Sequence, residues 1–348
     1  MAIGVQQQPC LDGFRHRVAA HCATGALRDL LEHHCVSYSP EPLSEGAVFG
    51  LSGALDLHLR LDSAVELDGR AAALELELCR NLGLDAWWCE TDDPSTGWQQ
   101  LRSELDAGEP TLLRADAGEL SYHDDSAHDT RHAIVATSCD VQAGVVWVAD
   151  GRFADPQRCT LSSLAAARAS DGWPEPARHA LLRLRRPERL ADPRAAAAAA
   201  LTRVVQSMRR PERGAAPHAR KGLAAIDALA AAWPWLPAST GPRLAEMFAA
   251  LGFRVRDGSS GGTLYRSLQA RFEHDAAALL GSAQLGRAAL VCDDLADAWR
   301  AFAAALDDED AARAHTVAQP WLERVRTLEH RHVEALEEHL GMRSAALA

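Results

Sequence analysis

The sequence predicts an α+β protein in which a domain of mixed helices and strands is followed by a domain made of helices alone. In the first half, short helical patterns alternate with runs rich in β-branched and aromatic residues. After the segment LRLRRPERLADPR, alanine, leucine and arginine dominate at helical spacing. The 348 residues are enough for two domains. We therefore expect domains over residues 1–190 and 191–348.

The elements of the first domain follow from local patterns. Residues 23–34 place leucines and alanines on one helical stripe, 70–82 form a helix that ends at Gly83, and WQQLRSELDAG forms another. Runs typical of strands cover 86–91, 111–116, 132–138 and 145–150. In the second domain, proline and glycine signals separate helices expected at 193–208, 220–232, 241–251, 263–281, 283–306 and 317–340.

Composition argues against several classes of protein. The formal net charge of −12 disfavours general nucleic-acid binding. The N-terminus has no basic segment before an apolar one, and no apolar run approaches the roughly 20 residues of a membrane-spanning helix. We therefore expect a cytoplasmic protein with no membrane or nucleic-acid partner.

The cysteines and histidines do not predict a metal site. Eight cysteines are scattered without a C-x-x-C pair, so we expect free thiols. The run HHC at 33–35 offers ligand types, but adjacent positions of a helix point in different directions.

Charge is distributed unevenly along the chain. Residues 178–221 contain twelve basic residues and three acidic ones. Such an excess is typical of a surface that docks an acidic partner. A solvated linker with paired surface charges explains the same composition.

Cys22 stands at the first turn of the predicted helix, directly after His21. A helix N-terminus stabilises negative charge through its free amides and aligned peptide dipoles, which favours the nucleophilic thiolate. The alternative is a small, buried apolar cysteine.

HAIVATSCDVQAGVVWVAD predicts a β-hairpin. If Thr137 pairs with Val145, His132 lies directly opposite Asp150 on the same face, with Cβ atoms roughly 4.5–5.5 Å apart. The carboxylate can then orient the imidazole, as the third member of a triad does. A slip of one residue would separate the two side chains. A structural histidine and a strand-ending aspartate remain the alternative.

Several short motifs, in order, resemble one family. HCATGALRDLL, LSEGAVFGLSGAL, LLRADAGELSYH and RHAIVATSCD with VVWVADGRFADPQ resemble the N-terminal domain of the butirosin-biosynthesis protein H family, a papain-like cysteine fold. Residues 195–345 resemble the helical domain of unknown function that commonly follows it. The order of these motifs is more specific than any one of them.

The resemblance implies an acyltransferase of natural-product biosynthesis. In the family's founding protein, an acyl group moves from the thioester of an acyl carrier protein to an amine of an aminoglycoside. By resemblance, Cys22 is the nucleophile, His132 the general base and acid, and Asp150 the orienting residue. The implied donor is a phosphopantetheine thioester, with no bound cofactor or metal. The implied partners are an acidic carrier protein, docking on 178–221, and a small amine acceptor.

Other residues are weaker candidates for the same site. The Cys22 amide is one candidate oxyanion donor, and His21 or an amide near Gly50–Gly53 is a candidate for the second. We list His21, Gly50, Ser52, Gly53, Tyr122 and His123 as substrate-binding candidates, although Tyr122 and His123 also suit a surface loop.

Two other functions fit the same residues. A cysteine peptidase or amidase differs only in whether water or an amine resolves the acyl-enzyme. A catalytically idle binding protein can keep the fold and the residues. The helical domain carries no catalytic motif; it is expected to cover the cleft, form a homodimer or dock the carrier.

Overall fold

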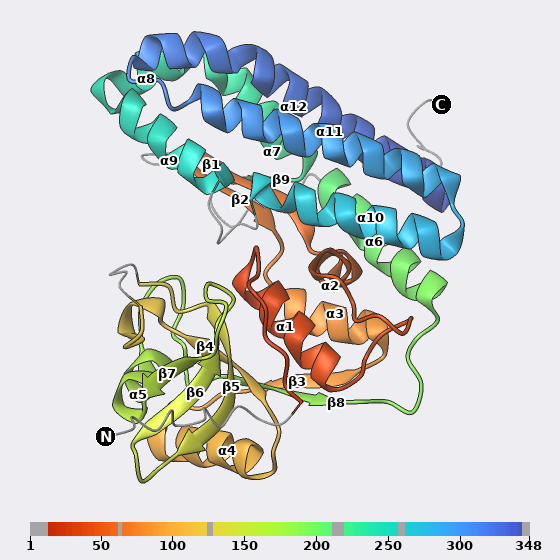
Figure 1. Cartoon of the computed structure of the whole chain (residues 1–348). Coiled ribbons are helices and arrows are strands. Elements are labelled where there is room, and N and C mark those ends of the chain that lie inside the picture. The colour runs from red at the N-terminus through yellow and green to blue at the C-terminus, as the bar shows by residue number, and fades with distance from the viewer. Residues whose placement is uncertain (1–12, 62–64, 124–127, 211–218, 257–261, 343–348) are drawn as a thin grey trace, which may run out of the picture. The chain divides into compact units, whose positions relative to one another are not determined.

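The computed structural model describes residues 13–61, 65–123, 128–210, 219–256 and 262–342 (Figure 1). Its contacts divide the chain into two compact units. Unit 1 comprises Met1–Leu43 and Leu84–Leu190, and unit 2 comprises Ser44–Gly83 and Ala191–Ala348. The mixture of helices and strands with a C-terminal helical region is consistent with the predicted α+β class.

Residues 44–83 pack within the helical unit, although the sequence analysis placed them in the range 1–190. Helix α2 (Glu45–Ser52) packs against α10 (Arg266–Leu280), and strand β1 (Leu55–Leu61) pairs with β9 (Ala219–Lys221). These contacts join segments about 160 to 220 residues apart in the sequence, and local periodicity contains no information about such pairings.

Unit 1 is built on a six-stranded antiparallel sheet in the order β3-β8-β4-β5-β6-β7. Its strands are β3 (Asp85–Cys89), β4 (Thr111–Ala115), β5 (His132–Asp140), β6 (Val145–Ala149), β7 (Gln157–Thr160) and β8 (Leu181–Arg185). Its helices are α1 (Cys22–His33), α4 (Pro94–Asp106) and α5 (Leu161–Ala169), with the 3-10 turn η1 (Ala117–Glu119). The four predicted strands and the helices around 23–34 and WQQLRSELDAG are confirmed, whereas β7, β8 and α5 were not predicted.

Both faces of the sheet are covered. Leucines of α4 and α5 pack on strand residues such as Ile134 and Val148 to form one core. Alternate residues, including Leu112 and Val135, point to the other face, where α1 packs against β4 and β5. The buried sheet therefore supplies a rigid frame for the start of α1 and the ends of β5 and β6.

The β5–β6 hairpin differs from the predicted register. Asp140 pairs with Val145, so the turn is shorter than expected, and the predicted pairing of Thr137 with Val145 is wrong. Thr137 is an extra residue between the Ala136–Val148 and Ser138–Trp147 pairs, which makes it a β-bulge. Its hydroxyl donates to the Trp147 carbonyl at 3.2 Å.

The bulge places His132 and Asp150 on the same face of the hairpin. Continued without it, the register at the turn would place Asp150 opposite Val135, on the face away from His132. With it, Asp150 follows opposite Ile134, and His132 is its diagonal neighbour on the same face. The two side chains therefore meet diagonally and not as the directly opposed pair that was predicted.

Unit 2 contains a bundle of helices and a small sheet in the order β2-β1-β9. Besides the elements named above, it contains β2 (Val65–Arg70), α3 (Leu74–Leu82), α6 (Pro193–Arg209), α7 (Leu223–Ala232), α8 (Leu236–Thr240), α9 (Leu244–Arg256), α11 (Ala283–Ala305), α12 (Ala311–Leu340) and the turns η2 (Trp233–Trp235), η3 (Gly241–Arg243) and η5 (Thr263–Tyr265). The six predicted helices are confirmed, whereas the sheet was not predicted. In the described part of the chain, no helix combines the length and the apolar composition that crossing a bilayer requires.

The packing of helix α2 explains why Gly50, Ser52 and Gly53 occupy their positions. A Cβ on Gly50 would lie 1.9 Å from Cγ of Phe272, so only glycine permits this approach of α2 to α10. The buried Ser52 hydroxyl donates to the Phe49 carbonyl, and Gly53 ends the helix at a φ of 62°. These surroundings give all three residues a packing role in unit 2, and their predicted substrate-binding role stays a prediction.

Replacing Gly50 with alanine is expected to destabilise unit 2 by about 1–3 kcal/mol, because the new methyl group overlaps the Phe272 ring. Gly286→Ala is the matched control, since a Cβ there would meet Ala277 at an ordinary 3.8 Å and alanine favours a helix. Calorimetric unfolding should show a lower melting temperature for Gly50→Ala alone. Equal stability of the two variants would contradict the packing argument.

Candidate active site

Cys22 is the first residue of α1, and its neighbour His21 is the N-cap. Nδ1 of His21 accepts a hydrogen bond from the Thr24 amide at 3.3 Å, in the place where an N-cap usually presents an oxygen. The predicted helix start is confirmed. The backbone amide of Cys22 is one of the first amides of α1, which have no acceptor within the helix.

Asp150 is completely buried just after β6 and collects hydrogen bonds from four groups. Its Oδ2 accepts from Nε2 of His132 at 2.7 Å, Nε2 of His123 at 2.9 Å and the Tyr122 hydroxyl at 3.2 Å. Its Oδ1 accepts from the Arg152 amide at 3.0 Å. Burial raises the pKa of the Asp150 carboxyl, but the hydrogen bonds from His123 and His132 outweigh it and hold that pKa far below its usual range.

His123 and Tyr122 are neutral donors to this carboxylate. Arg152 donates to Nδ1 of His123 at 3.3 Å, which fixes the His123 proton on Nε2. Burial and the Asp150 charge raise the pKa of Tyr122 well above its usual value, so its hydroxyl keeps its proton. The polar groups of both residues face Asp150, and their predicted substrate-binding role stays a prediction. The negative charge of Asp150 is left to pair with His132.

The Cys22 thiol and the His132 imidazole are hydrogen-bonding neighbours. Because Nε2 of His132 faces Asp150, Nδ1 is the nitrogen left for the thiol. Burial would raise the pKa of the Cys22 thiol, but the imidazoles of His21 and His132 outweigh it and hold that pKa well below its usual value. Burial would lower the pKa of His132, but Asp150 and Cys22 raise it. The favoured state is a thiolate paired with an imidazolium.

His16 is a positioning residue that the sequence reasoning missed. Its Nδ1 lies 2.7 Å from Oδ2 of Asp29 on α1, and its Nε2 lies 3.1 Å from the Asp150 carbonyl and 3.0 Å from that of Phe153. Burial lowers the pKa of His16, but the Asp29 carboxylate raises it above its usual value. A doubly protonated ring can donate to all three groups, and it ties the Asp150 loop to α1. No short motif marks His16, since its partners are up to 137 residues away.

In the described residues, three groups of side chains bring together atoms that can bind a metal ion, all within 4.8 Å of one another in each group. His123, His132 and Asp150 form one, but their hydrogen bonds to a single carboxylate oxygen account for that cluster. His33, His34 and Glu109 form a second at the surface, without Cys35 of the HHC run. Glu273, Cys292 and His332 form the third, which is buried in unit 2 and which no sequence motif indicated.

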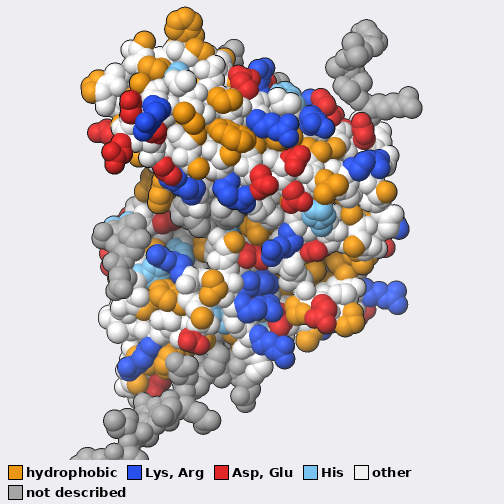
Figure 2. Space-filling view, turned by 45° about the horizontal axis from the view of Figure 1, so that its top comes forward, with side chains coloured by type: hydrophobic (Ala, Val, Ile, Leu, Met, Phe, Trp, Pro, Cys, Tyr) orange, Lys and Arg blue, Asp and Glu red, His pale blue; other side chains and the backbone are white. Residues whose placement is uncertain are grey.

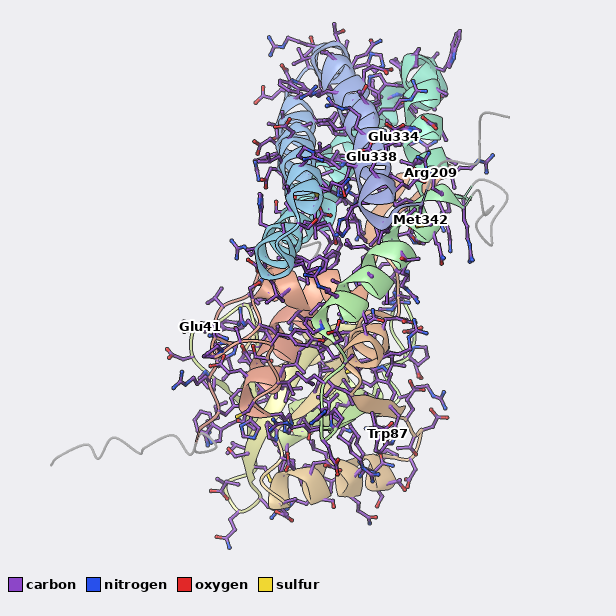
Figure 3. The ribbon with its side chains drawn as sticks, turned by 90° about the vertical axis from the view of Figure 1, so that its right-hand side faces the viewer. Glu41, Trp87, Arg209, Glu334, Glu338 and Met342 are labelled. Atoms are coloured by element: carbon purple, nitrogen blue, oxygen red, sulfur yellow. The ribbon has the colours of Figure 1, made fainter. Side chains whose placement is uncertain are left out.

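The basic stretch 178–221 does not form one described surface. It is divided between the two units, and residues 211–218 are outside the described residues. Figure 3 shows Arg209 of α6 near Glu334 and Glu338 of α12, and Figure 2 shows acidic and basic side chains interspersed over the helices of unit 2. Ion pairs within each unit engage four arginines: Arg178 with Asp92, Arg183 with Glu104, Arg203 with Glu77 and Arg209 with Glu337. Carrier docking on this stretch stays a prediction.

Comparison with known families gives two matches. Residues 21–151 match the family model described as Butirosin biosynthesis protein H, N-terminal, and residues 162–336 match the model described as Domain of unknown function (DUF4872). Their order agrees with the order inferred from the motifs. No curated protein matches the chain.

The thiolate–imidazolium pair predicts rapid alkylation of Cys22 in weak acid. At pH 6 we expect iodoacetamide to modify Cys22 far faster than it modifies N-acetylcysteine, whose thiol is then almost fully protonated. His132→Ala should slow this reaction by about tenfold or more, because the cationic partner is lost. Mass spectrometry of the labelled peptide gives the rates, and His33→Ala is the control. Cys22 labelling that follows the pH curve of the free thiol would count against the pair.

Replacing His16 with alanine is expected to cost about 2 kcal/mol of stability, because charge-assisted hydrogen bonds to Asp29 and two carbonyls are lost. The folded pKa of His16 is above its unfolded value of about 6.5. Its contribution is therefore complete below that pH and declines as pH rises through the folded pKa. The melting-temperature gap between wild type and variant should be wider at pH 6 than at pH 9. A gap that widens toward alkaline pH would exclude the proposed protonation.

Proposed function

Because the chain belongs to the butirosin-biosynthesis protein H family, we propose that it is a cysteine-dependent acyltransferase that uses a papain-like arrangement of Cys22, His132 and Asp150. The donor is an acyl group held as a thioester on the phosphopantetheine of an acyl carrier protein. The acceptor is a small-molecule amine, and the product is an amide of a biosynthetic pathway for a natural product.

One observation carries this proposal: a thiol at a helix start meets an imidazole that a buried carboxylate holds in place. The carboxylate fixes the ring through Nε2, which directs Nδ1 toward sulfur. It also stabilises the imidazolium, so that the resting sulfur is already anionic. A cysteine with only a packing role does not require an imidazole that a carboxylate orients toward its sulfur.

In the first half-reaction, the Cys22 thiolate attacks the thioester carbonyl. The helix N-terminus stabilises the negative charge that develops on oxygen, with the Cys22 amide as one donor. The carbon–sulfur bond to pantetheine then breaks, and the departing sulfur takes the proton from Nδ1 of His132. The products are an acyl group on Cys22, a free pantetheine thiol and a neutral His132.

In the second half-reaction, the acceptor amine attacks the acyl group on Cys22. Neutral His132 accepts a proton from the attacking nitrogen, and the bond between the carbonyl carbon and Cys22 sulfur breaks. The amide leaves, and the thiolate–imidazolium pair is restored. Asp150 stays ionised throughout, because its hydrogen bonds favour the charged form. The thioester supplies the driving force, so the proposed reaction needs no nucleotide.

The proposal predicts that the full chain, mixed with an acyl-loaded carrier protein, gains the mass of one acyl group on Cys22. Adding an amine should then remove that mass and yield the amide. Cys22→Ala should lose both steps, with at least a 10³-fold fall in transfer rate, as expected when a nucleophile is removed. Its melting temperature should be nearly that of wild type, and Cys35→Ala, at an exposed cysteine, is the matched control.

Three results would contradict the proposal. Full transfer by Cys22→Ala would remove the nucleophile from the mechanism. Acyl-enzyme that water resolves as fast with an amine present as without one would favour a hydrolase. Cleavage of peptides without turnover of acyl-pantetheine thioesters would favour a peptidase on the same three residues.

A further inference from the structure

Unit 2 encloses polar side chains from three helices at its centre. Gln269 and Glu273 lie one turn apart on α10, Cys292 lies on α11 and His332 lies on α12. All four are completely buried. Helix α11 packs against both α10 and α12, and it runs side by side with α12 (Figure 1). Such groups are rarely buried unless each polar atom has a partner.

Several atoms of this cluster have no hydrogen-bond partner. Oε1 of Glu273 accepts from Nε2 of Gln269 and from Nε2 of His332, both at 2.8 Å. Among the described residues, Oε2 of Glu273, Oε1 of Gln269 and Nδ1 of His332 have no partner. A buried polar atom without a partner loses its hydrogen bonds to water and gains none in return, which destabilises the fold. Three together, within one cluster, indicate that a ligand completes it.

A neighbouring ion pair does not neutralise this cluster. Nε of Arg266 donates to Oε1 of Glu329 at 2.9 Å, and Nε1 of Trp299 donates to the same oxygen at 2.8 Å. The Arg266 charge is therefore balanced by Glu329. The charge of Glu273 is then removed by a proton on the carboxyl itself, or balanced by a proton on His332 or by a bound cation.

We propose that Glu273, Cys292 and His332 bind a structural Zn²⁺ ion. One ligand atom from each lies within 4.8 Å of the others, which is compatible with a shared ion after small side-chain movements. A carboxylate oxygen, a thiolate sulfur and an imidazole nitrogen are ligand types that zinc prefers. The unpartnered Oε1 of Gln269 is the candidate for the fourth position of a tetrahedral site.

Charge balance supports a divalent ion. A thiolate and a carboxylate together neutralise Zn²⁺, and His332 binds in its neutral form. In the metal-free protein the same neutrality requires two protons, one on the Cys292 sulfur and one shared by the Glu273 and His332 pair. Binding therefore exchanges one zinc ion for two protons, and no net charge is buried in either state.

The site would be structural and not catalytic. All its ligands are fully enclosed, so substrate has no access to the ion. Its effect would be to connect α10, α11 and α12 through one centre, in the way that structural zinc sites contribute to folding. This inference does not depend on the acyltransferase proposal, because none of its ligands belongs to unit 1.

Metal analysis of the full chain tests the site. Protein expressed with zinc and freed of loose metal should retain about one zinc ion per chain. Cys292→Ala and His332→Ala should each lose nearly all of it. Cys79→Ala is the matched control, since Cys79 is also buried in unit 2 but is absent from the cluster. Cys22→Ala should also retain the ion.

A spectroscopic measurement tests the site in a variant that keeps all three ligands, in case the ligand variants fail to fold. In a Cys22→Ala, Cys35→Ala double variant, cobalt exchanged for zinc should show a thiolate-to-metal charge-transfer band in the near ultraviolet. The proposal is overturned if this folded double variant, refolded with excess metal, shows no such band and retains no ion. Loss of zinc in Cys22→Ala together with retention in Cys292→Ala would also overturn it.

Discussion

The candidate site of unit 1 depends on one buried negative charge. Asp150 has no exposed surface, and four donors surround its two oxygens. Because His123 and Tyr122 donate as neutral groups, the charge itself is left for His132. The raised pKa of His132 and the lowered pKa of Cys22 both follow from that charge and from the imidazole beside sulfur. A neutral residue at 150 would keep the shape of the site but lose the reason for its ion pair.

That charge is useful only where backbone geometry presents it correctly. The bulge at Thr137 sets the face on which Asp150 emerges, and His16 ties the loop after β6 to α1 through Asp29. Ala19 adds a second contact between this loop and α1. Its amide donates to the Gly151 carbonyl at 2.9 Å, and its methyl group leaves no room for a side chain at Gly25. The nucleophile and its acid–base partner are thus fixed to one framework, which keeps the cost of aligning them low.

Unit 2 contains the same three types of side chain in a different environment. A cysteine, a histidine and a carboxylate again lie together, but here they are enclosed by helices, and several of their atoms are unpaired. In unit 1 the carboxylate is fully hydrogen-bonded and the residue Cys22 is only partly buried. Accessibility and hydrogen bonding, and not residue type, separate a site suited to nucleophilic chemistry from one suited to an ion.

The sequence by itself determined the local structure. Periodicity and capping signals placed α1, the strands β3 to β6 and most of the helices of unit 2, because these signals act between near neighbours. They missed the short helices α2 and α8. They also placed Cys22 at a helix start, and strand alternation brought His132 and Asp150 to one face, although with a wrong register. Only the tertiary structure decided the bulge, the membership of residues 44–83, the role of His16 and the buried cluster around Glu273. Each of these depends on which distant surfaces are buried against one another, and hydrophobic spacing along one element does not specify its partner.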